Sequence, residues 1–323
     1  MDQGKTVLVL GGTGHYGRHI VRSLAAKGVP VRVLTRSATR ARGILPETVE
    51  IVEGDIESRE AVVIAIQGVG RVVVSVSAFN RKQIRRMWAI EREAVIAALD
   101  EAKKAGIRRI VYVSVFDIRE PTAGRLPLDN AQIKLEVERH LASSGFNWTI
   151  IGTPPSMEIF FAMTRGDRMV VPGGGPKALP TISPVDLGEI VAQTTLRDDL
   201  GGRRIRVAGP ELLSFPEAAR RLSAVYGKRI RFLAIPLVLP RMAWYVTRPL
   251  IRLSSTLYFV NTMLGFIQLL NGFPEEIGLG ALEDHKDLVR TFNYTPTTLE
   301  MEARRRESAV EQGHAAVGAL RCS

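Results

Sequence analysis

The sequence of 323 residues predicts an α/β protein with a doubly wound parallel sheet and a smaller, interleaved C-terminal lobe. Three observations support this fold class. An apolar run ends in a glycine-rich turn at residues 7–18, and short β-rich runs then alternate with helical stretches. The alternation stops near residue 153, where loops rich in proline and glycine begin. Such alternation favours a parallel sheet with both faces covered by helices.

The first expected strand, Thr6–Leu10, runs directly into a glycine-rich turn and then into an expected helix at Gly17–Lys27. Glycines allow a tight turn and let the backbone approach a phosphate closely. The helix N-terminus adds free N–H groups and a positive dipole end. We therefore predict a dinucleotide site here, with His15 and Tyr16 over the pyrophosphate or at the mouth of the pocket. The predicted contacts in the turn are Gly11, Thr13, Gly14, His15, Tyr16 and Gly17.

The residues after the second expected strand, Val31–Leu34, indicate which dinucleotide is bound. An acid at this position accepts a hydrogen bond from the adenosine 2′-hydroxyl, whereas a basic residue accommodates a 2′-phosphate. The chain reads Thr35-Arg36-Ser37 and has no acid at this position. Because a guanidinium binds phosphate through forked, charge-assisted hydrogen bonds, we predict NADP(H). Arg36 is the expected main contact, with Thr35 or Ser37 as hydroxyl donors.

The remaining elements follow in order along the chain. Further strands are expected at Val49–Glu53, Arg71–Ser75, Arg109–Val113, Trp148–Gly152 and Arg203–Ala208. Further helices are expected at Ser58–Ile66, Ile84–Ala105 and Asn130–Ser143, from Ser183-Pro184 onward, and at Phe215–Tyr226. Ligands of doubly wound sheets bind beyond the carboxyl ends of the strands. Site residues should therefore follow the strands, including Asp55-Ile56, Val76-Ser77 and Ser114–Asp117.

Residues 232–273 are unusually apolar. Leu253–Phe273 has no charged residue and is long enough to span a bilayer, but seven polar side chains and Gly265 interrupt it. We expect a lobe that lines a substrate pocket. Arginines beside apolar helices leave peripheral contact with an anionic membrane surface as an alternative, and a spanning helix as a weaker one.

The expected domain limits follow from these shifts in pattern. A dinucleotide-binding domain should cover residues 1–210, with a substrate-lobe insertion near 154–182. A C-terminal substrate lobe should cover 211–302, and 303–323 should form a frayed helix and a flexible tail.

The composition of the chain limits which binding partners, and which disulfide or metal sites, we expect. The net charge of +11 is high, but the basic residues are spread along the chain and form no recognised nucleic-acid motif, so no nucleic acid is expected. The single cysteine, Cys322, excludes a disulfide framework, and the five histidines lack metal-ligand spacing, so we expect no metal. No signal peptide is visible, which leads us to expect a cytoplasmic protein. The oligomeric state is left open.

Several motifs together resemble the atypical short-chain dehydrogenase/reductases, and most closely the NmrA-like group, which includes relatives of a complex I subunit. The resemblance covers about residues 5 to 300. Besides the glycine turn and Arg36, the motifs are Gly54-Asp55-Ile56, Tyr112-Val113-Ser114, Lys134-Leu135-Glu136-Val137-Glu138 and Ile182-Ser183-Pro184-Val185-Asp186-Leu187.

The resemblance implies a Rossmann domain that binds NADP(H), with a lobe that closes over the nicotinamide. It implies that Asp55 and Ile56 flank the adenine and that Ser77 lies along the adenosine ribose. Lys134 matches the lysine that contacts the nicotinamide ribose in this family.

The catalytic residues are less well defined. Enzymes of the broader family carry a proton-donating tyrosine four residues before the lysine, and this chain has Asn130 there. Three alternatives remain. In the first, the pKa of Lys134 lies nearer neutrality and this residue acts as the acid or base. In the second, the substrate needs little acid catalysis. In the third, the protein catalyses no reaction. Ser114 is a candidate for orienting a substrate oxygen or for capping a strand end, and Asp117 for a proton relay or a solvated loop acid.

The function predicted from the sequence is an NADPH-dependent reductase of an apolar, conjugated or quinone-like small molecule, with Lys134 and Ser114 as candidate catalytic residues. The alternative is a non-catalytic NADP(H)-binding sensor or assembly factor at a membrane surface.

Overall fold

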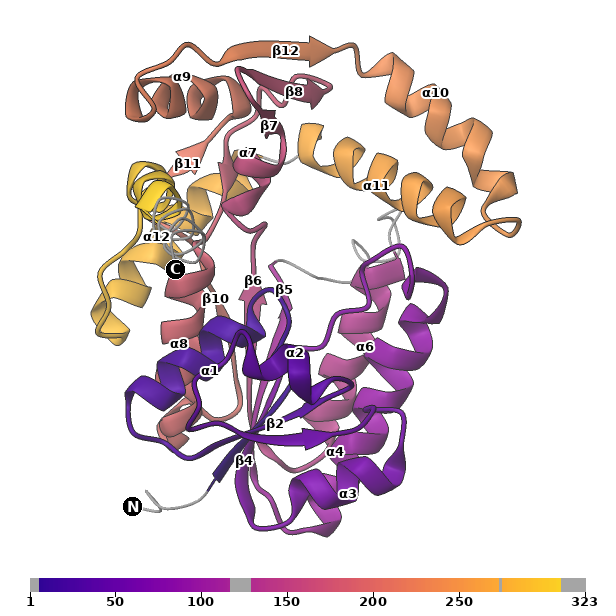
Figure 1. Ribbon diagram of the computed structural model, residues 1–323, viewed down its shortest axis with the longest axis vertical. Coiled ribbons are helices and arrows are strands. Elements are labelled where there is room, and N and C mark those ends of the chain that lie inside the picture. Colours follow the sequence, from indigo (N-terminus) through magenta and orange to yellow (C-terminus); the bar gives the residue numbers. More distant parts are fainter. Residues whose placement is uncertain (1–5, 117–128, 273–274, 309–323) are drawn as a thin grey trace, which may run out of the picture.

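In a computed structural model, residues 6–116, 129–272 and 275–308 are described, and they form a seven-stranded sheet beneath a smaller lobe (Figure 1). Asp117, Cys322 and the expected tail at 309–323 lie outside the described residues. All neighbouring strands of the sheet pair in parallel, in the order β10-β6-β5-β4-β1-β2-β3. The strands are β1 (Thr6–Leu10), β2 (Val31–Thr35), β3 (Glu50–Glu53), β4 (Val69–Val74), β5 (Arg109–Val115), β6 (Asn147–Thr153) and β10 (Arg203–Arg206). The predicted doubly wound fold is confirmed.

The first strand shows why the sheet needs helices on both faces. Successive side chains of a strand point to opposite faces. Leu8 and Leu10 pack into one buried cluster, and Val7 and Val9 pack into another. Helices α3 (Arg59–Ile66), α4 (Ala94–Lys104) and α6 (Asp129–Ser143) cover the first cluster, and α1 (Gly17–Ala26) and α8 (Pro184–Leu196) cover the second. A short helix, α2 (Ala38–Arg42), follows β2.

The single helix expected at Ile84–Ala105 is divided in the structure. It begins as a 3-10 turn, η1 (Ile84–Arg86), passes through a π-helical segment, η2 (Ala89–Glu93), and continues as α4. A π turn widens the helix by one residue and often marks a functional position. Here the widened turn carries Glu91, whose side chain is completely buried.

The lobe lies beyond the carboxyl ends of the central strands (Figure 1). Its three-stranded sheet combines β7 (Thr164–Arg165), β8 (Arg168–Pro172) and β12 (Arg231–Ile235), and β9 (Leu179–Pro180) pairs with β11 (Leu212–Leu213). Its helices are α7 (Glu158–Ala162), α9 (Phe215–Val225), α10 (Val238–Thr247), η4 (Arg248–Leu250) and α11 (Ser255–Asn271). A separate apolar cluster joins the expected insertion near 154–182 to the later part of the chain, through residues such as Phe160 and Phe215.

The described part of the apolar stretch, 232–272, folds as β12, α10, η4 and α11 rather than as one continuous helix. Among the helices of the described segments, none is both long enough and apolar enough to cross a membrane. Helix α12 (Glu275–Thr291) follows, and residues 299–308 form a further helix. Within it Leu299 and Ala303 are fully buried in the lobe cluster, so the start of the helix is anchored, whereas Arg304, Arg305, Glu307 and Ser308 are exposed.

Helices α1 and α8 are in close contact at Gly188. A Cβ atom there would lie 2.7 Å from the backbone carbonyl carbon of His19, so a side chain cannot enter without shifting the helices. We expect Gly188→Ala to lower the free energy of unfolding by about 1–3 kcal/mol. Gly280 of α12 is a matched control, because its Cβ would meet only an Arg206 nitrogen, at 3.8 Å.

Gly280→Ala should be neutral or should raise stability by up to about 1 kcal/mol, since alanine favours a helix more than glycine does. Urea unfolding of both variants measures the difference. Equal effects of the two substitutions would contradict the close packing of α1 on α8.

Candidate active site

The glycine turn after β1 is packed against the loop after β4. Gly11 has φ +84°, and a Cβ there would lie 2.4 Å from the Ser75 carbonyl oxygen. The Gly14 N–H donates to the Gly11 carbonyl at 2.9 Å, and a Cβ on Gly17 would lie 2.1 Å from the same oxygen. No side chain fits at Gly11 or Gly17, and the turn leaves backbone exposed where β1 and β4 diverge. This is the position at which doubly wound folds bind nucleotides.

The N-terminus of α1 fits an anion. Tyr16 at the N-cap makes no side-chain cap hydrogen bond, and the first turn contains no acid. The side chains of the cap and of the first turn therefore do not neutralise the positive end of the helix dipole. With the sterically required glycines, this arrangement fits the pyrophosphate of a dinucleotide.

His15 and Tyr16 connect the glycine turn to the segment after β6. His15 Nε2 lies 3.0 Å from Ser156 Oγ, its Nδ1 lies 3.2 Å from a Glu158 carboxylate oxygen, and the Tyr16 hydroxyl donates to the Pro154 carbonyl at 3.4 Å. Burial raises the pKa of Tyr16 well above its ordinary value, so this hydroxyl stays protonated. Both side chains lie between the turn and the lobe, and their contacts with a dinucleotide stay a prediction.

The loop after β2 carries the expected phosphate contacts. The exposed Arg36 guanidinium lies within hydrogen-bonding distance of the Gln83 side-chain amide, from the segment after β4. Ser37 caps α2, accepting from the Arg40 N–H at 3.3 Å, and Thr35 Oγ1 accepts from the Ser37 N–H at 3.5 Å. Arg36 therefore stands beside two hydroxyls that shape the loop.

An acid that the sequence reasoning missed lies at the same loop. Glu53 ends β3 and is paired with Thr35 in the sheet register. One of its carboxylate oxygens accepts from the Ala38 N–H at 3.2 Å. The Glu53 carboxylate is therefore hydrogen-bonded to the N–H of Ala38, which lies two residues after Arg36. The pairing of β2 with β3 creates this contact, which the spacing of 15 residues along the chain does not indicate.

Asp55, Ile56 and Ser77 lie where the sequence placed them, after β3 and β4. Asp55 accepts from the Glu57 N–H at 3.1 Å, and Ser77 accepts from the Phe79 N–H at 3.3 Å. Ile56 packs against the core cluster. These contacts order the loops, and the predicted roles at the adenine and the adenosine ribose stay predictions.

Lys134 of α6 forms a buried ion pair with Glu91. Lys134 Nζ lies 3.0 Å from a Glu91 carboxylate oxygen and donates to the Val76 carbonyl at 3.0 Å. The other Glu91 oxygen accepts from the Ala78 N–H at 2.6 Å. The exposed fractions of the two residues are 6% and 0%. The pair thus joins α6, the π-helical segment and the loop after β4.

The ion pair changes the expected protonation of Lys134. Burial by itself lowers the pKa of the amine, but the Glu91 carboxylate and Tyr112 outweigh it and raise the pKa above its ordinary value. The expectation that Lys134 titrates nearer neutrality is therefore wrong. At neutral pH it is a fixed cation, which donates hydrogen bonds and stabilises negative charge but does not readily release a proton.

Ser114 belongs to a neighbouring buried network. Its hydroxyl donates to Glu138, one helical turn after Lys134 on α6. Glu138 in turn accepts from Arg204 at 2.9 Å, and Arg204 also donates to the carbonyls of Val115 and Phe116 at 2.7 and 2.8 Å. The Ser114 proton is thus engaged within the protein, and a contact with substrate stays a prediction.

Asn130 lies in the first turn of α6, in the place of the family tyrosine. The preceding residue, Asp129, accepts a hydrogen bond from the hydroxyl of Tyr258 on α11. Burial, reinforced by Asp129, raises the pKa of Tyr258 above its ordinary value. Helix α11 of the lobe therefore contacts the sheet domain next to Asn130, the residue that stands in the place of a proton-donating tyrosine.

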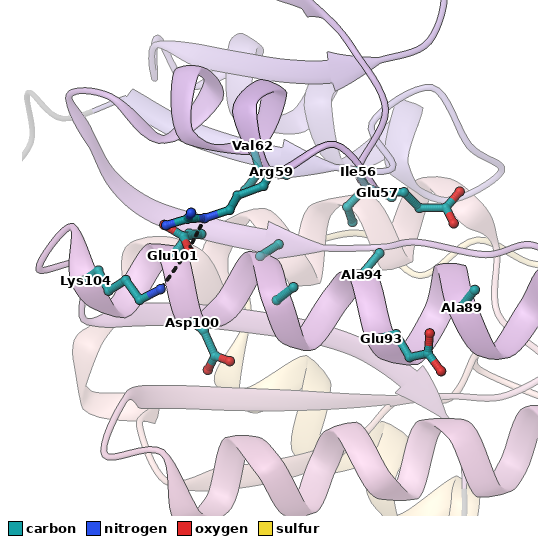
Figure 2. A pocket seen from close by; sticks show the side chains of 12 residues that line it. Ile56, Glu57, Arg59, Val62, Ala89, Glu93, Ala94, Asp100, Glu101 and Lys104 are labelled. Atoms are coloured by element: carbon teal, nitrogen blue, oxygen red, sulfur yellow. Dashed lines mark hydrogen bonds and ion pairs between the residues drawn. The ribbon is translucent and has the colours of Figure 1, made fainter.

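A groove of about 450 Å³ lies elsewhere, between α3 and α4 (Figure 2). Arg59 and Lys104 both pair with Glu101 at one end of it, at 2.9 and 2.8 Å. Of the predicted site residues, Ile56 alone lines it. The groove therefore does not replace the carboxyl edge of the sheet as the candidate site.

The sequence reasoning missed the roles of Glu91 and Glu138, which are buried, and of Arg204, which is partly buried. One signal was available for Glu91. It is four residues after Met87 and four before Val95, and both of these are buried apolar residues of the same helical stretch. A charge on an apolar helical face needs a buried partner, and Lys134 provides it.

The comparisons with known proteins agree with this geometry. A family model described as NAD(P)H-binding matches residues 11–196, more than half of the chain. An NAD(P)H azoreductase of Xenophilus azovorans is 28% identical over 72% of this chain and 77% of its own length. An NmrA-like family domain-containing oxidoreductase of Malbranchea aurantiaca is 28% identical over 73% of this chain and 77% of its own length.

Among solved structures, the NADPH-dependent quinone oxidoreductase of Escherichia coli, in complex with NADPH, superposes with a TM-score of 0.68. It is 20% identical, and the match covers 93% of this chain and 99% of that one. At this identity the likeness concerns the fold.

The Lys134–Glu91 pair should be tested by a double-mutant cycle. Removing one partner leaves the other charge buried and uncompensated, so we expect Glu91→Gln to lower the free energy of unfolding by about 3 kcal/mol. In Lys134→Met/Glu91→Gln neither charge remains, and the loss should be smaller than the sum of the two single losses. Urea unfolding at neutral pH measures all four proteins, and additive losses would contradict the ion pair.

Proposed function

The chain belongs to the NAD(P)H-binding family, and on that premise we propose that it is an NADPH-dependent reductase of an apolar, conjugated or quinone-like molecule. The predicted relationship to NmrA-like atypical short-chain dehydrogenase/reductases is confirmed at this level. The observation that carries the proposal is that Lys134 is held as a cation by Glu91, while Asn130 stands where a proton donor would be.

The preference for NADPH over NADH rests on the loop after β2. Arg36 supplies a forked, exposed guanidinium suited to a 2′-phosphate, and the hydroxyls of Thr35 and Ser37 lie in the same loop. Glu53 opposes this preference, because its carboxylate occupies the Ala38 N–H and repels a phosphate. We infer that Arg36 outweighs Glu53, since the exposed guanidinium can exchange its contact with the Gln83 side chain for one with a ligand, while the carboxylate is held by a backbone hydrogen bond.

The class of molecule that accepts the hydride follows from which groups of the candidate site can release a proton. When bound, the reduced nicotinamide supplies a hydride. The Lys134 ammonium, which the resemblance places at the nicotinamide ribose, stabilises negative charge that develops nearby. An isolated carbonyl becomes a strongly basic alkoxide and needs a proton from an acid in the site. A conjugated acceptor spreads the charge and takes its proton from solvent, so Asn130 is no obstacle.

The relative from Xenophilus azovorans supports this acceptor class. It is named as an NAD(P)H azoreductase, and an azo group is a conjugated N=N acceptor. The apolar composition of the lobe supports an apolar substrate, since residues 232–273 contain few charged side chains.

The alternative function is an NADP(H)-binding sensor or assembly factor without catalysis. Asn130 in place of the tyrosine is the observation that favours it. Turnover distinguishes the two functions, because a sensor binds NADPH without consuming it in the presence of acceptors.

Cofactor preference is tested at Arg36 and Glu53. We expect Arg36→Ala to weaken NADPH binding about tenfold or more and to leave NADH binding nearly unchanged, since only NADPH has the phosphate that pairs with the guanidinium. Glu53→Gln should strengthen NADPH binding, because it removes a like charge from the same loop. Fluorescence titration measures both. Equal affinity of the wild type for NADH and NADPH, or no effect of Arg36→Ala, would contradict the preference.

Catalysis is tested by NADPH consumption with a panel of quinones, azo compounds and saturated carbonyl compounds. We expect turnover with the conjugated acceptors and a loss of about a hundredfold in Lys134→Met, since one electrostatic contact to developing charge is lost. Lys104→Met is a matched control on the exposed end of α4 and should keep wild-type rates.

Retained NADPH binding shows that the Lys134 variant is folded. If it does not fold, Lys134→Met/Glu91→Gln replaces it. NADPH binding without turnover by the wild type would favour the sensor, and reduction of saturated carbonyl compounds alone would overturn the acceptor class.

A further inference from the structure

The outer face of α10 and of the turn after it is apolar. Large apolar side chains recur there at helical spacing, and each is between 40% and 75% exposed. They are Val238, Leu239, Met242, Tyr245, Val246, Leu250 and Leu253; we call these seven residues the α10 stripe. A surface helix of a globular protein normally turns its apolar face toward the core. In this helix the apolar face points to solvent.

The orientation of α10 is fixed by its packing on α11. Pro240 and Trp244 are buried on the opposite side of the helix. Asn261 of α11 donates to the Trp244 carbonyl at 2.7 Å and to the Thr247 hydroxyl at 2.9 Å. The exposure of the α10 stripe is therefore a property of the packed lobe and not of a loosely placed helix.

The charged residues of the segment that carries the stripe are all of one sign. Between residues 228 and 274 the sequence contains no Asp or Glu, although about one residue in ten of the whole chain is acidic. The charged residues of this segment are Lys228, Arg229, Arg231, Arg241, Arg248 and Arg252. Three of them, Arg241, Arg248 and Arg252, are exposed and alternate with the stripe along the chain.

We propose that the α10 stripe docks on an anionic lipid surface. An exposed apolar helix face that alternates with three exposed arginines matches a bilayer interface, which accepts the apolar side chains and attracts the arginines. A second copy of the same face would place like charges opposite each other across a two-fold axis. Helix α10 lies at the outer edge of the lobe (Figure 1), where an extended lipid surface can reach it.

The docked face is connected to the candidate active site. Helix α11 continues from the turn after η4 and carries Tyr258, which bonds to Asp129, and Phe259, whose ring lies 6.1 Å from that of Phe79 after β4. Arg85 donates to the Ile251 and Arg252 carbonyls at 3.2 and 2.7 Å, which ties the turn to the sheet domain. Docking would hold the lobe side of the site toward the membrane, where apolar substrates partition.

Sedimentation with vesicles tests the docking proposal without any measurement of NADPH turnover. A negative result would therefore contradict membrane docking and would leave the proposed reductase function untouched. The full chain should co-sediment with vesicles of phosphatidylcholine mixed with phosphatidylglycerol, and much less with phosphatidylcholine alone. Added salt should weaken the binding. Arg241→Gln should lower the partition coefficient about fivefold, as expected for one arginine near an anionic surface.

The decisive variant is Met242→Glu/Val246→Glu, which places two acids on the α10 stripe and should abolish binding to the mixed vesicles. Both side chains are at least 60% exposed, so the fold should tolerate the change, and unchanged thermal unfolding verifies it. Ile64→Glu is the matched control, since Ile64 is an exposed apolar residue of α3 remote from the lobe; it should bind as the wild type does.

Three results would overturn the proposal. They are no binding to the mixed vesicles, equal binding to phosphatidylcholine alone, or undiminished binding of Met242→Glu/Val246→Glu. A wild-type dimer that this double variant dissociates in the absence of lipid would assign the stripe to a second copy of the chain instead.

Discussion

The buried ion pair between Lys134 and Glu91 is the constraint on which the candidate active site depends. A carboxylate with no exposed surface requires compensation, and Lys134 Nζ and the Ala78 N–H provide it. Meeting this requirement brings α6, the π-helical segment and the loop after β4 to one point. The same pair favours the charged form of Lys134, because the adjacent carboxylate raises the pKa of the amine.

The lobe is attached to the sheet domain by polar contacts along the carboxyl edge. His15 and Tyr16 connect the glycine turn to the segment after β6, Tyr258 connects α11 to the start of α6, and Arg85 holds the turn before α11. Most of these contacts are partly exposed, whereas the two apolar clusters within the sheet domain are buried. Tyr258 and Phe259 of α11 also pack against the first of these clusters, so hydrogen bonds and apolar contacts together join the lobe to the sheet domain.

Two opposing charges lie at the loop after β2, Arg36 in the loop itself and Glu53 at the end of the adjacent strand β3. Arg36 favours a phosphate, and Glu53 on the adjacent strand disfavours one while holding the Ala38 N–H. Because both groups lie at the surface, water and salt screen each of them, and geometry decides between them. A guanidinium that can approach the ligand in a forked arrangement has the advantage over a carboxylate fixed to the backbone.

The sequence by itself determined the local features of the fold and the order in which they follow along the chain. These features are the glycine turn, the basic residue after β2 and the alternation of β and α segments. These are local patterns, because turn geometry needs glycine at Gly11 and Gly17, and strands buried on both faces need continuous apolar runs. Only the tertiary structure decided that Lys134 stays charged, that Ser114 is engaged by Glu138, that Glu53 lies beside Arg36 and that the α10 stripe faces outward. Each of these four features depends on contacts between residues that are distant in the sequence. Such contacts form only when helices and strands pack against one another.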